Sequence, residues 1–217
     1  MIKAVVFDFD GLIIDTESVW YESYKEVFEI YQIEFHWELF VRCVGTDDSV
    51  LNQYIDEKVA GLQVTRDDIK RQARELHKVK MKAIPMREGV RDYLNDAKSL
   101  GLKIGLASSS TREWVEFFLK KLQIDDYFEV ISTGDQVEKV KPDPTLYLRT
   151  LEHLEVSAHE SVAFEDSSNG AKAATRAGLK CVIVPNELTQ FLTFEKYDLR
   201  LSSMDEMSLE QVIQRLN

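Results

Sequence analysis

The sequence predicts an α/β protein whose mostly parallel sheet carries helices on both faces, with an all-helical domain inserted after the first strand. Short apolar segments rich in β-branched residues are typical of strands that are covered on both faces. Helical patterns alternate with these segments, which favours a parallel sheet with crossover helices. One region, residues 17–83, shows helical patterns but no good strand.

The alternation of strands and helices can be followed along the chain. The first expected strand covers residues 2–9 and is nearly continuous in apolar residues. Four further strands are expected at 102–107, 128–131, 161–164 and 180–184, and the intervening helices at 90–100, 112–122, 144–154 and 169–177. In such a sheet the ligands bind beyond the carboxyl ends of the strands, so we expect the functional residues there.

The inserted region carries apolar residues at helical spacing. One stripe consists of Trp20, Tyr24, Val27, Phe28 and Tyr31, and another of Ile69, Ala73, Leu76 and Val79. Such stripes are typical of helices that bury one face, and about four helices of the four-helix-bundle type are expected. We therefore expect a helical domain at residues 16–83 and an α/β core formed by residues 1–15 and 84–217.

Composition limits the classes of function. The 217 residues are 44% hydrophobic and 30% charged, as in an ordinary globular protein, and the formal net charge is −11. This charge repels nucleic acids and anionic membrane surfaces, so neither is an expected partner. The chain has no apolar segment long enough to span a bilayer and no signal peptide pattern, so a cytoplasmic location is expected. Cys43 and Cys181 are expected as small buried hydrophobes.

Two aspartates follow the first expected strand. Asp8 and Asp10 are two residues apart, so their side chains start on the same face, and Gly11 then frees the backbone to turn. Two close carboxylates repel each other unless a cation or a shared proton intervenes. With Mg²⁺ beside them, one can stay ionised as a nucleophile while the other exchanges a proton. Alternatively, the two acids only cap a turn.

Polar and charged residues also follow the later strands. Ser108, Ser109 and two further hydroxyl residues precede a helix, where free N–H groups favour a phosphate. Lys141 lies in "KVKPDP", and Glu165 and Asp166 lie in "FEDSSNG". Taken singly, these are a helix cap, a solvated lysine and surface acids. Together, at one edge of a sheet, they predict a site that holds a phosphoryl group next to Mg²⁺.

Four segments in order, "DFDGLIIDTE", "LASSS", "KPDP" and "FEDSSNG", resemble the signature motifs of the haloacid dehalogenase-like hydrolase superfamily. The resemblance extends over the whole chain. It implies a Rossmann-like α/β core, and the helical insert resembles the cap domain of the β-phosphoglucomutase and sugar-phosphate phosphatase branch.

The resemblance also implies roles for individual residues. Asp8 would attack phosphorus and become an aspartyl phosphate. Asp10 would protonate the leaving alkoxide and then deprotonate the water that hydrolyses the intermediate. Ser108 and Lys141 would hold the phosphoryl oxygens. The implied Mg²⁺ ligands are the Asp8 carboxylate, the Asp10 backbone carbonyl and Asp166, with Glu165 beside them.

Substrate choice is expected to depend on the cap, because the core recognises only phosphate and metal. The candidates for substrate contacts are Thr16 and Trp20 on the first cap helix, Asp47 in the turn "VGTDD", and Ser109 in the core. A role for Trp20 in the core of the cap is equally open, because it belongs to an apolar stripe.

The sequence departs from β-phosphoglucomutases at two places. Members of that branch carry a histidine near the position of Trp20 and an arginine in the loop where this chain has Thr46, Asp47 and Asp48. An aspartate there would repel a second phosphate. The expected function is therefore a Mg²⁺-dependent phosphatase that acts on small phosphate monoesters, sugar phosphates above all, as a monomer or weak dimer.

Two alternatives stay open. The first is a phosphosugar mutase of the β-phosphoglucomutase type. The second is a receiver-type signalling module, which is also phosphorylated on an aspartate at the strand ends of a parallel sheet. The receiver is disfavoured by the acid–base candidate Asp10, by the helical insert and by the length of the chain.

Overall fold

The computed structural model describes residues 1–43 and 49–216, which form two compact units. The core unit comprises residues 1–14, 85–186 and 193–217. The helical unit comprises residues 15–84 and 187–192. Among the described residues, none of the helices combines the length and apolar character needed to cross a membrane.

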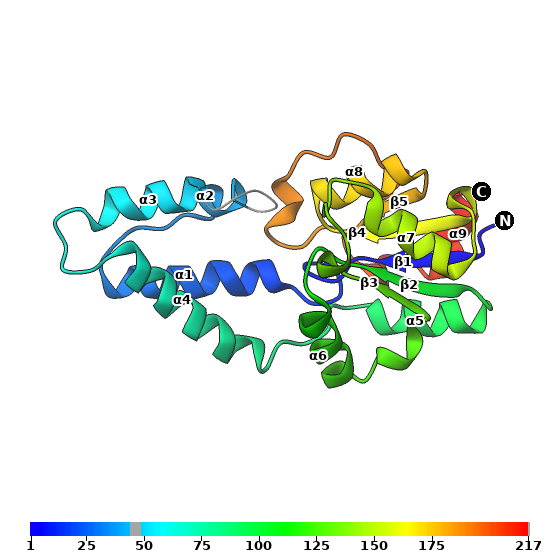
Figure 1. The fold of residues 1–217 in the computed structure, drawn as a ribbon, viewed down its shortest axis with the longest axis horizontal. Coiled ribbons are helices and arrows are strands. Elements are labelled where there is room, and N and C mark those ends of the chain that lie inside the picture. The colour runs from blue at the N-terminus through cyan, green and yellow to red at the C-terminus, as the bar shows by residue number, and fades with distance from the viewer. Residues whose placement is uncertain (44–48, 217) are drawn as a thin grey trace. The chain divides into compact units, whose positions relative to one another are not determined.

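The core unit is built around a six-stranded sheet in the order β3-β2-β1-β4-β5-β6, and each pair of neighbouring strands is parallel (Figure 1). The strands are β1 (Ala4–Phe7), β2 (Lys103–Ala107), β3 (Val130–Ser132), β4 (Ser161–Glu165), β5 (Lys180–Ile183) and β6 (Leu199–Arg200). The helices of this unit are α5 (Val90–Ser99), α6 (Arg112–Leu122), α7 (Thr145–Leu154), α8 (Ser168–Ala177) and α9 (Leu209–Leu216). The predicted α/β fold class is confirmed.

Side-chain alternation along β1 explains how helices cover both faces of the sheet. Ala4 and Val6 belong to an apolar cluster with residues of α7 and α8. Phe7 points to the other face, where it stacks on Phe164 of β4, and Phe164 meets the ring of Tyr93 from α5. A strand with both faces covered must be apolar throughout, which is why β1 reads as an uninterrupted apolar run.

The helical unit contains α1 (Thr16–Ile30), α2 (Trp37–Val41), α3 (Ser49–Val59) and α4 (Arg66–Met81). Helices α1 and α4 pack against each other, and Lys80 of α4 pairs with Glu26 of α1 at 2.5 Å. The segment 187–192, which follows β5 in the chain, also belongs to this unit. Leu188 lies in its apolar cluster, and the ring of Phe191 meets Trp37 with centroids 4.1 Å apart. The sequence analysis did not anticipate this segment.

The buried face of α4 differs from the predicted stripe. Ile69 and Ala73 are buried as expected, but Val79 is 62% exposed, and His77 and Met81 are buried instead. The buried residues of α4 follow one another at intervals of four, from Ile69 to Met81. Residues four apart lie on the same face of a helix, and position 79 falls outside this face. The two-residue strand β6 was also missed, because two residues are too few for a periodic pattern.

Candidate active site

Three buried carboxylates gather where β1 and β4 end. Asp8 follows β1, Glu165 is the last residue of β4, and Asp166 comes directly after it. One carboxylate oxygen from each of the three lies within 4.8 Å of those from the other two. Because β1 and β4 are parallel neighbours, their carboxyl ends meet at the same edge of the sheet, as the order of the motifs predicted.

Lys141 lies among these acids. Its Nζ forms an ion pair with Asp8 and another, 2.7 Å long, with Glu165 Oε1. Burial disfavours the charged amine, but the carboxylates of Asp8 and Glu165 outweigh this and raise the pKa of Lys141. Lys141 thus places a positive charge between two of the buried acids at this edge of the sheet.

Glu165 is held on several sides. Its Oε1 also accepts a hydrogen bond of 2.5 Å from the hydroxyl of Tyr147 in α7. Burial and then the nearby charge of Asp8 raise the pKa of Glu165, although the contact with Lys141 opposes this shift. A Cβ atom at Gly170 would lie 1.8 Å from Glu165 Oε2. Glycine in the "FEDSSNG" motif therefore leaves room for this carboxylate.

Asp166 occupies a niche beside the loop that follows β1. Gly11 has a φ of +85°, and a Cβ atom there would lie 2.1 Å from Asp166 Oδ2. The same oxygen accepts a hydrogen bond from the Asn186 side-chain amide at 3.1 Å. The Arg87 side chain donates hydrogen bonds to the carbonyl of Gly11 in this loop and to the carbonyls of Val184 and Pro185 after β5. The position of Asp166 is thus determined by the chain segments after β1 and β5.

The Asp10 side chain turns towards α6 instead of joining the three carboxylates. Its Oδ2 accepts hydrogen bonds from the hydroxyl groups of Ser110 at 2.6 Å and Ser108 at 3.4 Å. Its Oδ1 accepts one from the Trp114 indole N–H at 2.9 Å. Burial raises the pKa of Asp10, the hydrogen bonds from Ser110 and Trp114 oppose the shift, and the charge of Asp8 adds to it.

The residues at this edge fit a divalent cation. Asp8, Glu165 and Asp166 bring three carboxylates together, whereas Lys141 supplies one positive charge to two of them. Carboxylate oxygens are the ligands that Mg²⁺ prefers, and a buried excess of negative charge is costly unless a cation offsets it. The absence of a side chain at Gly11 keeps the space beside Asp166 open.

The other predicted site residues lie elsewhere. Ser109 is exposed, whereas its neighbours Ser108 and Ser110 contact Asp10. Thr16 belongs to the helical unit, where it is buried at the start of α1. Trp20, also in α1, stacks on His77 of α4 with ring centroids 3.7 Å apart. The predicted contact at Asp47 lies outside the described residues.

Four residues at the site were missed by the sequence analysis. The sequence analysis did not assign Trp114, Tyr147, Arg87 or Asn186 to the site. Tyr147 follows Lys141 by six residues in the helix that begins after "KPDP", so its placement on the face towards the sheet could have been noticed. The contacts of Arg87 and Asn186 depend on the meeting of distant loops, for which the sequence carries no local signal.

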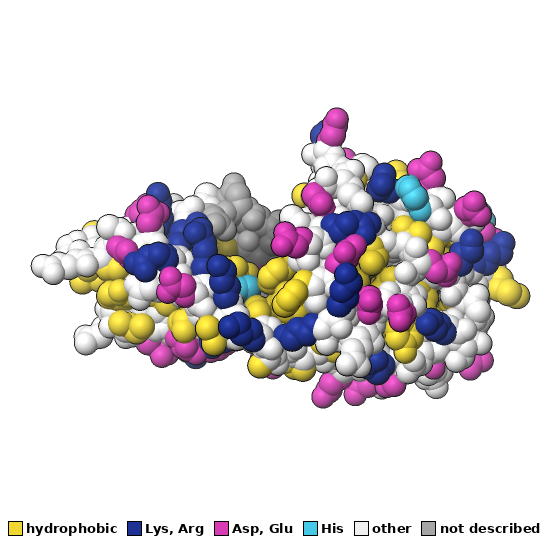
Figure 2. All heavy atoms as spheres, turned by 60° about the horizontal axis from the view of Figure 1, so that its bottom comes forward, with side chains coloured by type: hydrophobic (Ala, Val, Ile, Leu, Met, Phe, Trp, Pro, Cys, Tyr) yellow, Lys and Arg dark blue, Asp and Glu magenta, His cyan; other side chains and the backbone are white. Residues whose placement is uncertain are grey.

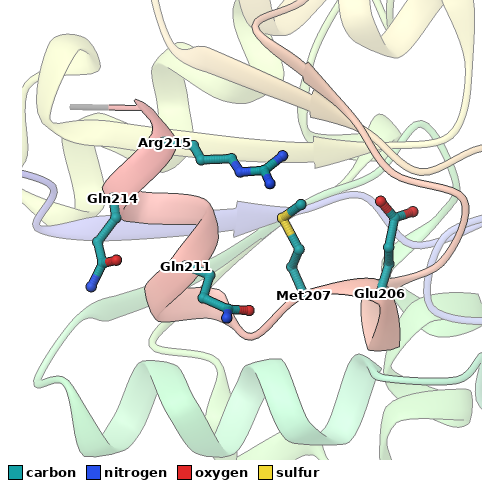
Figure 3. A pocket seen from close by; sticks show the side chains of 5 residues that line it. All are labelled: Glu206, Met207, Gln211, Gln214 and Arg215. Atoms are coloured by element: carbon teal, nitrogen blue, oxygen red, sulfur yellow. The ribbon is translucent and has the colours of Figure 1, made fainter.

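A separate surface pocket lies at the C-terminal helix. It has a volume of about 450 Å³ and is lined by Glu206, Met207, Gln211, Gln214 and Arg215. Figure 3 shows that three of these side chains come from α9 and the other two from the segment before it. Its lining residues are all distinct from those that surround Asp8.

Comparison with known proteins agrees with the motif assignment. YhcW of Bacillus subtilis (strain 168) is 48% identical over 218 residues, which cover 100% of this chain and 99% of that protein. A phosphorylated carbohydrates phosphatase of Thermotoga maritima is 34% identical over 178 residues, 82% of each chain. The structure of CbbY from Rhodobacter sphaeroides in complex with phosphate is 28% identical and superposes with a TM-score of 0.71 over 95% of this chain and 96% of that one.

The family assignment rests on most of the chain. Residues 5–184 match the haloacid dehalogenase-like hydrolases, a range that includes Asp8, Lys141 and Asp166. This chain therefore belongs to the haloacid dehalogenase-like hydrolase family.

Proposed function

We propose that this protein is a Mg²⁺-dependent phosphatase that hydrolyses small phosphate monoesters, sugar phosphates above all, through an aspartyl phosphate on Asp8. The observation that carries the proposal is the contact of Lys141 with both Asp8 and Glu165 inside a cluster of buried acids. A carboxylate next to a positively charged lysine can accept an anionic phosphoryl group, because the lysine offsets the repulsion between the two anions.

In the proposed reaction a carboxylate oxygen of Asp8 forms a bond to phosphorus while the bond from phosphorus to the ester oxygen breaks. Asp10 gives its proton to that oxygen, so the alcohol leaves neutral. Asp10 then takes a proton from a water molecule, whose oxygen attacks phosphorus. The bond between phosphorus and Asp8 breaks, and inorganic phosphate and the free carboxylate are released. Lys141 and Ser108 hold the phosphoryl oxygens during both steps.

In this proposal Mg²⁺ would be held by the carboxylates of Asp8 and Asp166 and by the backbone carbonyl of Asp10. Once bound, it would neutralise part of the charge that develops on the phosphoryl oxygens. Glu165 accepts hydrogen bonds from Lys141 and Tyr147, so we assign it to the orientation of Lys141 beside the metal. Asn186 and the chain at Gly11 orient Asp166.

The names of the relatives support the proposed substrate class. The Thermotoga maritima relative is named for phosphorylated carbohydrates, and the CbbY structure contains phosphate. In this chain the substrate contacts proposed outside the core are Thr16, Trp20 and Asp47, with Ser109 as the candidate within it. An aromatic surface such as Trp20 suits the apolar face of a sugar ring.

The test is phosphate release from a panel of sugar phosphates, phosphoglycolate, nucleotides and p-nitrophenyl phosphate, with Mg²⁺ and with EDTA. We expect turnover of one or more sugar phosphates, and its loss in EDTA and in Asp8→Asn. Asp126→Asn, which removes the charge of an exposed aspartate, is the matched control and keeps wild-type turnover. Activity that persists in Asp8→Asn or in EDTA would contradict the mechanism.

Two further measurements separate the alternatives. A mutase would convert β-glucose 1-phosphate to the 6-phosphate when a bisphosphate primer is supplied, with little release of phosphate. A receiver-type module would keep its phosphoaspartate for many minutes. Rapid turnover of the phosphoenzyme by water is the result that we expect, because Asp10 is available as a base.

A further inference from the structure

Both carboxylate oxygens of Asp10 are engaged by donors from the segment after β2. Trp114 donates its indole N–H to Oδ1 at 2.9 Å, and Ser110 donates its hydroxyl to Oδ2 at 2.6 Å. A carboxylate that is held at both oxygens cannot rotate about its last torsion without losing one of these bonds. The plane of the Asp10 carboxyl group is therefore fixed by contacts that the sequence analysis did not assign.

The chain holds the Trp114 ring firmly in place. Trp114 is the third residue of α6, and its backbone N–H donates to the hydroxyl of the N-cap residue Thr111. The indole meets the ring of Phe118 with centroids 4.7 Å apart, and Phe118 in turn packs against Phe9, the neighbour of Asp10. The cap fixes the backbone and the ring contact fixes the side chain, so the N–H group is directed at Oδ1.

The chemistry of the indole suits this place. An indole N–H donates one hydrogen bond and accepts none, and it neither gains nor loses a proton under physiological conditions. Trp114 can thus orient a carboxyl group that exchanges protons without competing for the proton itself. A serine hydroxyl, in contrast, both donates and accepts, so Ser110 can follow either protonation state of Asp10.

We infer that Trp114 is a positioning residue, whose indole N–H holds Asp10 in the orientation required for proton transfer to the leaving group and from water. The inference rests on the proposed function, in which Asp10 is the acid and base. It assigns to the "SSSTREW" segment a second role besides binding phosphoryl oxygens: the orientation of the group that moves protons.

The leaving group of the substrate provides the test. An alkoxide must be protonated as it departs, whereas p-nitrophenolate departs without a proton. We would measure the phosphorylation of the enzyme in a single turnover by rapid quench, with glucose 6-phosphate and with p-nitrophenyl phosphate, and follow the later hydrolysis by steady-state turnover. A sugar phosphate that proves a better substrate in the panel would replace glucose 6-phosphate.

In Trp114→Phe we expect phosphorylation by the sugar phosphate to slow about tenfold. This loss is smaller than the full effect of general acid catalysis. Phosphorylation by p-nitrophenyl phosphate stays within about twofold of wild type, because that step does not use the Asp10 proton. Steady-state turnover of p-nitrophenyl phosphate then slows at the hydrolysis step, which gives a burst of product and a KM no higher than that of wild type.

Two further variants keep the test decisive. Benzothienylalanine at position 114 replaces the N–H group by sulfur and keeps the size of the ring, so it tests the hydrogen bond even if Trp114→Phe does not fold. Trp37→Phe makes the same substitution in the helical unit and is expected to match wild type with both substrates.

Each outcome has one meaning. A slower phosphorylation step with the sugar phosphate alone supports the inference. Equally slowed phosphorylation with both substrates would show that Trp114 only maintains the fold. Wild-type phosphorylation and hydrolysis rates with both would show that its hydrogen bond is dispensable, and either of these two results overturns the inference. If the wild-type enzyme forms no phosphoenzyme with either substrate, the proposed function itself is wrong, and the inference is overturned with it.

Discussion

Lys141 is the residue on which the charge balance of the site depends. Its side chain is 5% exposed and pairs with the buried carboxylates of Asp8 and Glu165. Removal of one partner from a buried ion pair leaves an uncompensated charge and costs about 3 kcal/mol or more. The lysine therefore stabilises the fold, in addition to the role in holding phosphoryl oxygens that we propose for it.

We predict that Lys141→Met abolishes turnover and lowers the free energy of unfolding at pH 7 by about 3 kcal/mol. The deficit should shrink as the pH falls to 5, because the pKa of Glu165 is already raised and protonation removes its unpaired charge. Urea unfolding of both proteins in EDTA at the two pH values measures this. A deficit that grows towards acid would contradict the assigned charge balance.

Gly11 offers a second test at the scale of single residues. We predict that Gly11→Ala raises the Mg²⁺ concentration for half-maximal activity about tenfold, because the new methyl group displaces the Asp166 carboxylate. Gly61→Ala is the matched control: its φ of +87° imposes similar backbone strain, but its Cβ meets nothing within 4 Å. The idea fails if both variants show the same metal dependence in a Mg²⁺ titration of activity.

At the scale of elements, α4 contains a buried histidine. His77 stacks on Trp20, and burial lowers its pKa to about 4. In the unfolded chain the same group titrates at its ordinary value of 6.5. Between these two values the unfolded state binds a proton that the folded state does not, so the free energy of unfolding falls as the pH falls through this window.

We predict a pH dependence from His77 of up to about 1.4 kcal/mol per pH unit between pH 6 and pH 4.5. His77→Phe keeps a ring on Trp20 but cannot titrate, so its stability should change less over this range. The measurement is chemical denaturation of both proteins at several pH values. Parallel curves for wild type and variant would show that His77 does not carry the effect.

The elements also show how far sequence reasoning reaches. Strands β1, β2, β4 and β5 were predicted within a few residues because their apolar runs are bounded by charged or small residues. β3 was expected at 128–131 and lies at Val130–Ser132, and the short β6 was missed, because pairing with a neighbour and not local composition decides such segments. The face of α4 at His77 was assigned incorrectly because a histidine carries little hydrophobic signal.

The same limit applies to the site. The expectation that Asp8, Lys141, Glu165 and Asp166 lie close together could be made from sequence, since parallel strands deliver their carboxyl ends to one edge. The contacts of Trp114 with Asp10 and of Tyr147 with Glu165 could not be predicted. Both residues lie on helices, and the directions of their side chains depend on packing that no short motif encodes.

At the scale of the whole molecule, the charges on the surface are arranged differently from those at the candidate active site. On the face that Figure 2 shows, basic and acidic side chains are interspersed over the surface, although the formal net charge is −11. An anionic substrate gains little from the overall field of such a protein. In the proposed function, recognition of phosphate therefore depends on the enclosed Lys141 and on the Mg²⁺ that the carboxylates would hold.

The two units have separate apolar cores, and the helical one includes a segment from beyond β5. We predict that Leu188→Ala lowers the stability of the helical unit by about 3 kcal/mol, as expected for a cavity in its core. Hydrogen exchange should become faster in α1 and α4 but not in β1 and β4. Leu148→Ala, at a position that is 48% exposed, is the control. Uniform acceleration in both units would contradict the assignment of Leu188 to the helical core.

That assignment limits how the helical unit can be exchanged between enzymes. A chimera that carries only residues 15–84 in another hydrolase would lack Leu188 in the apolar cluster of the unit. It would also lack Phe191, whose ring contacts Trp37. Two segments that lie more than a hundred residues apart in the chain must therefore be transferred together for the unit to be complete.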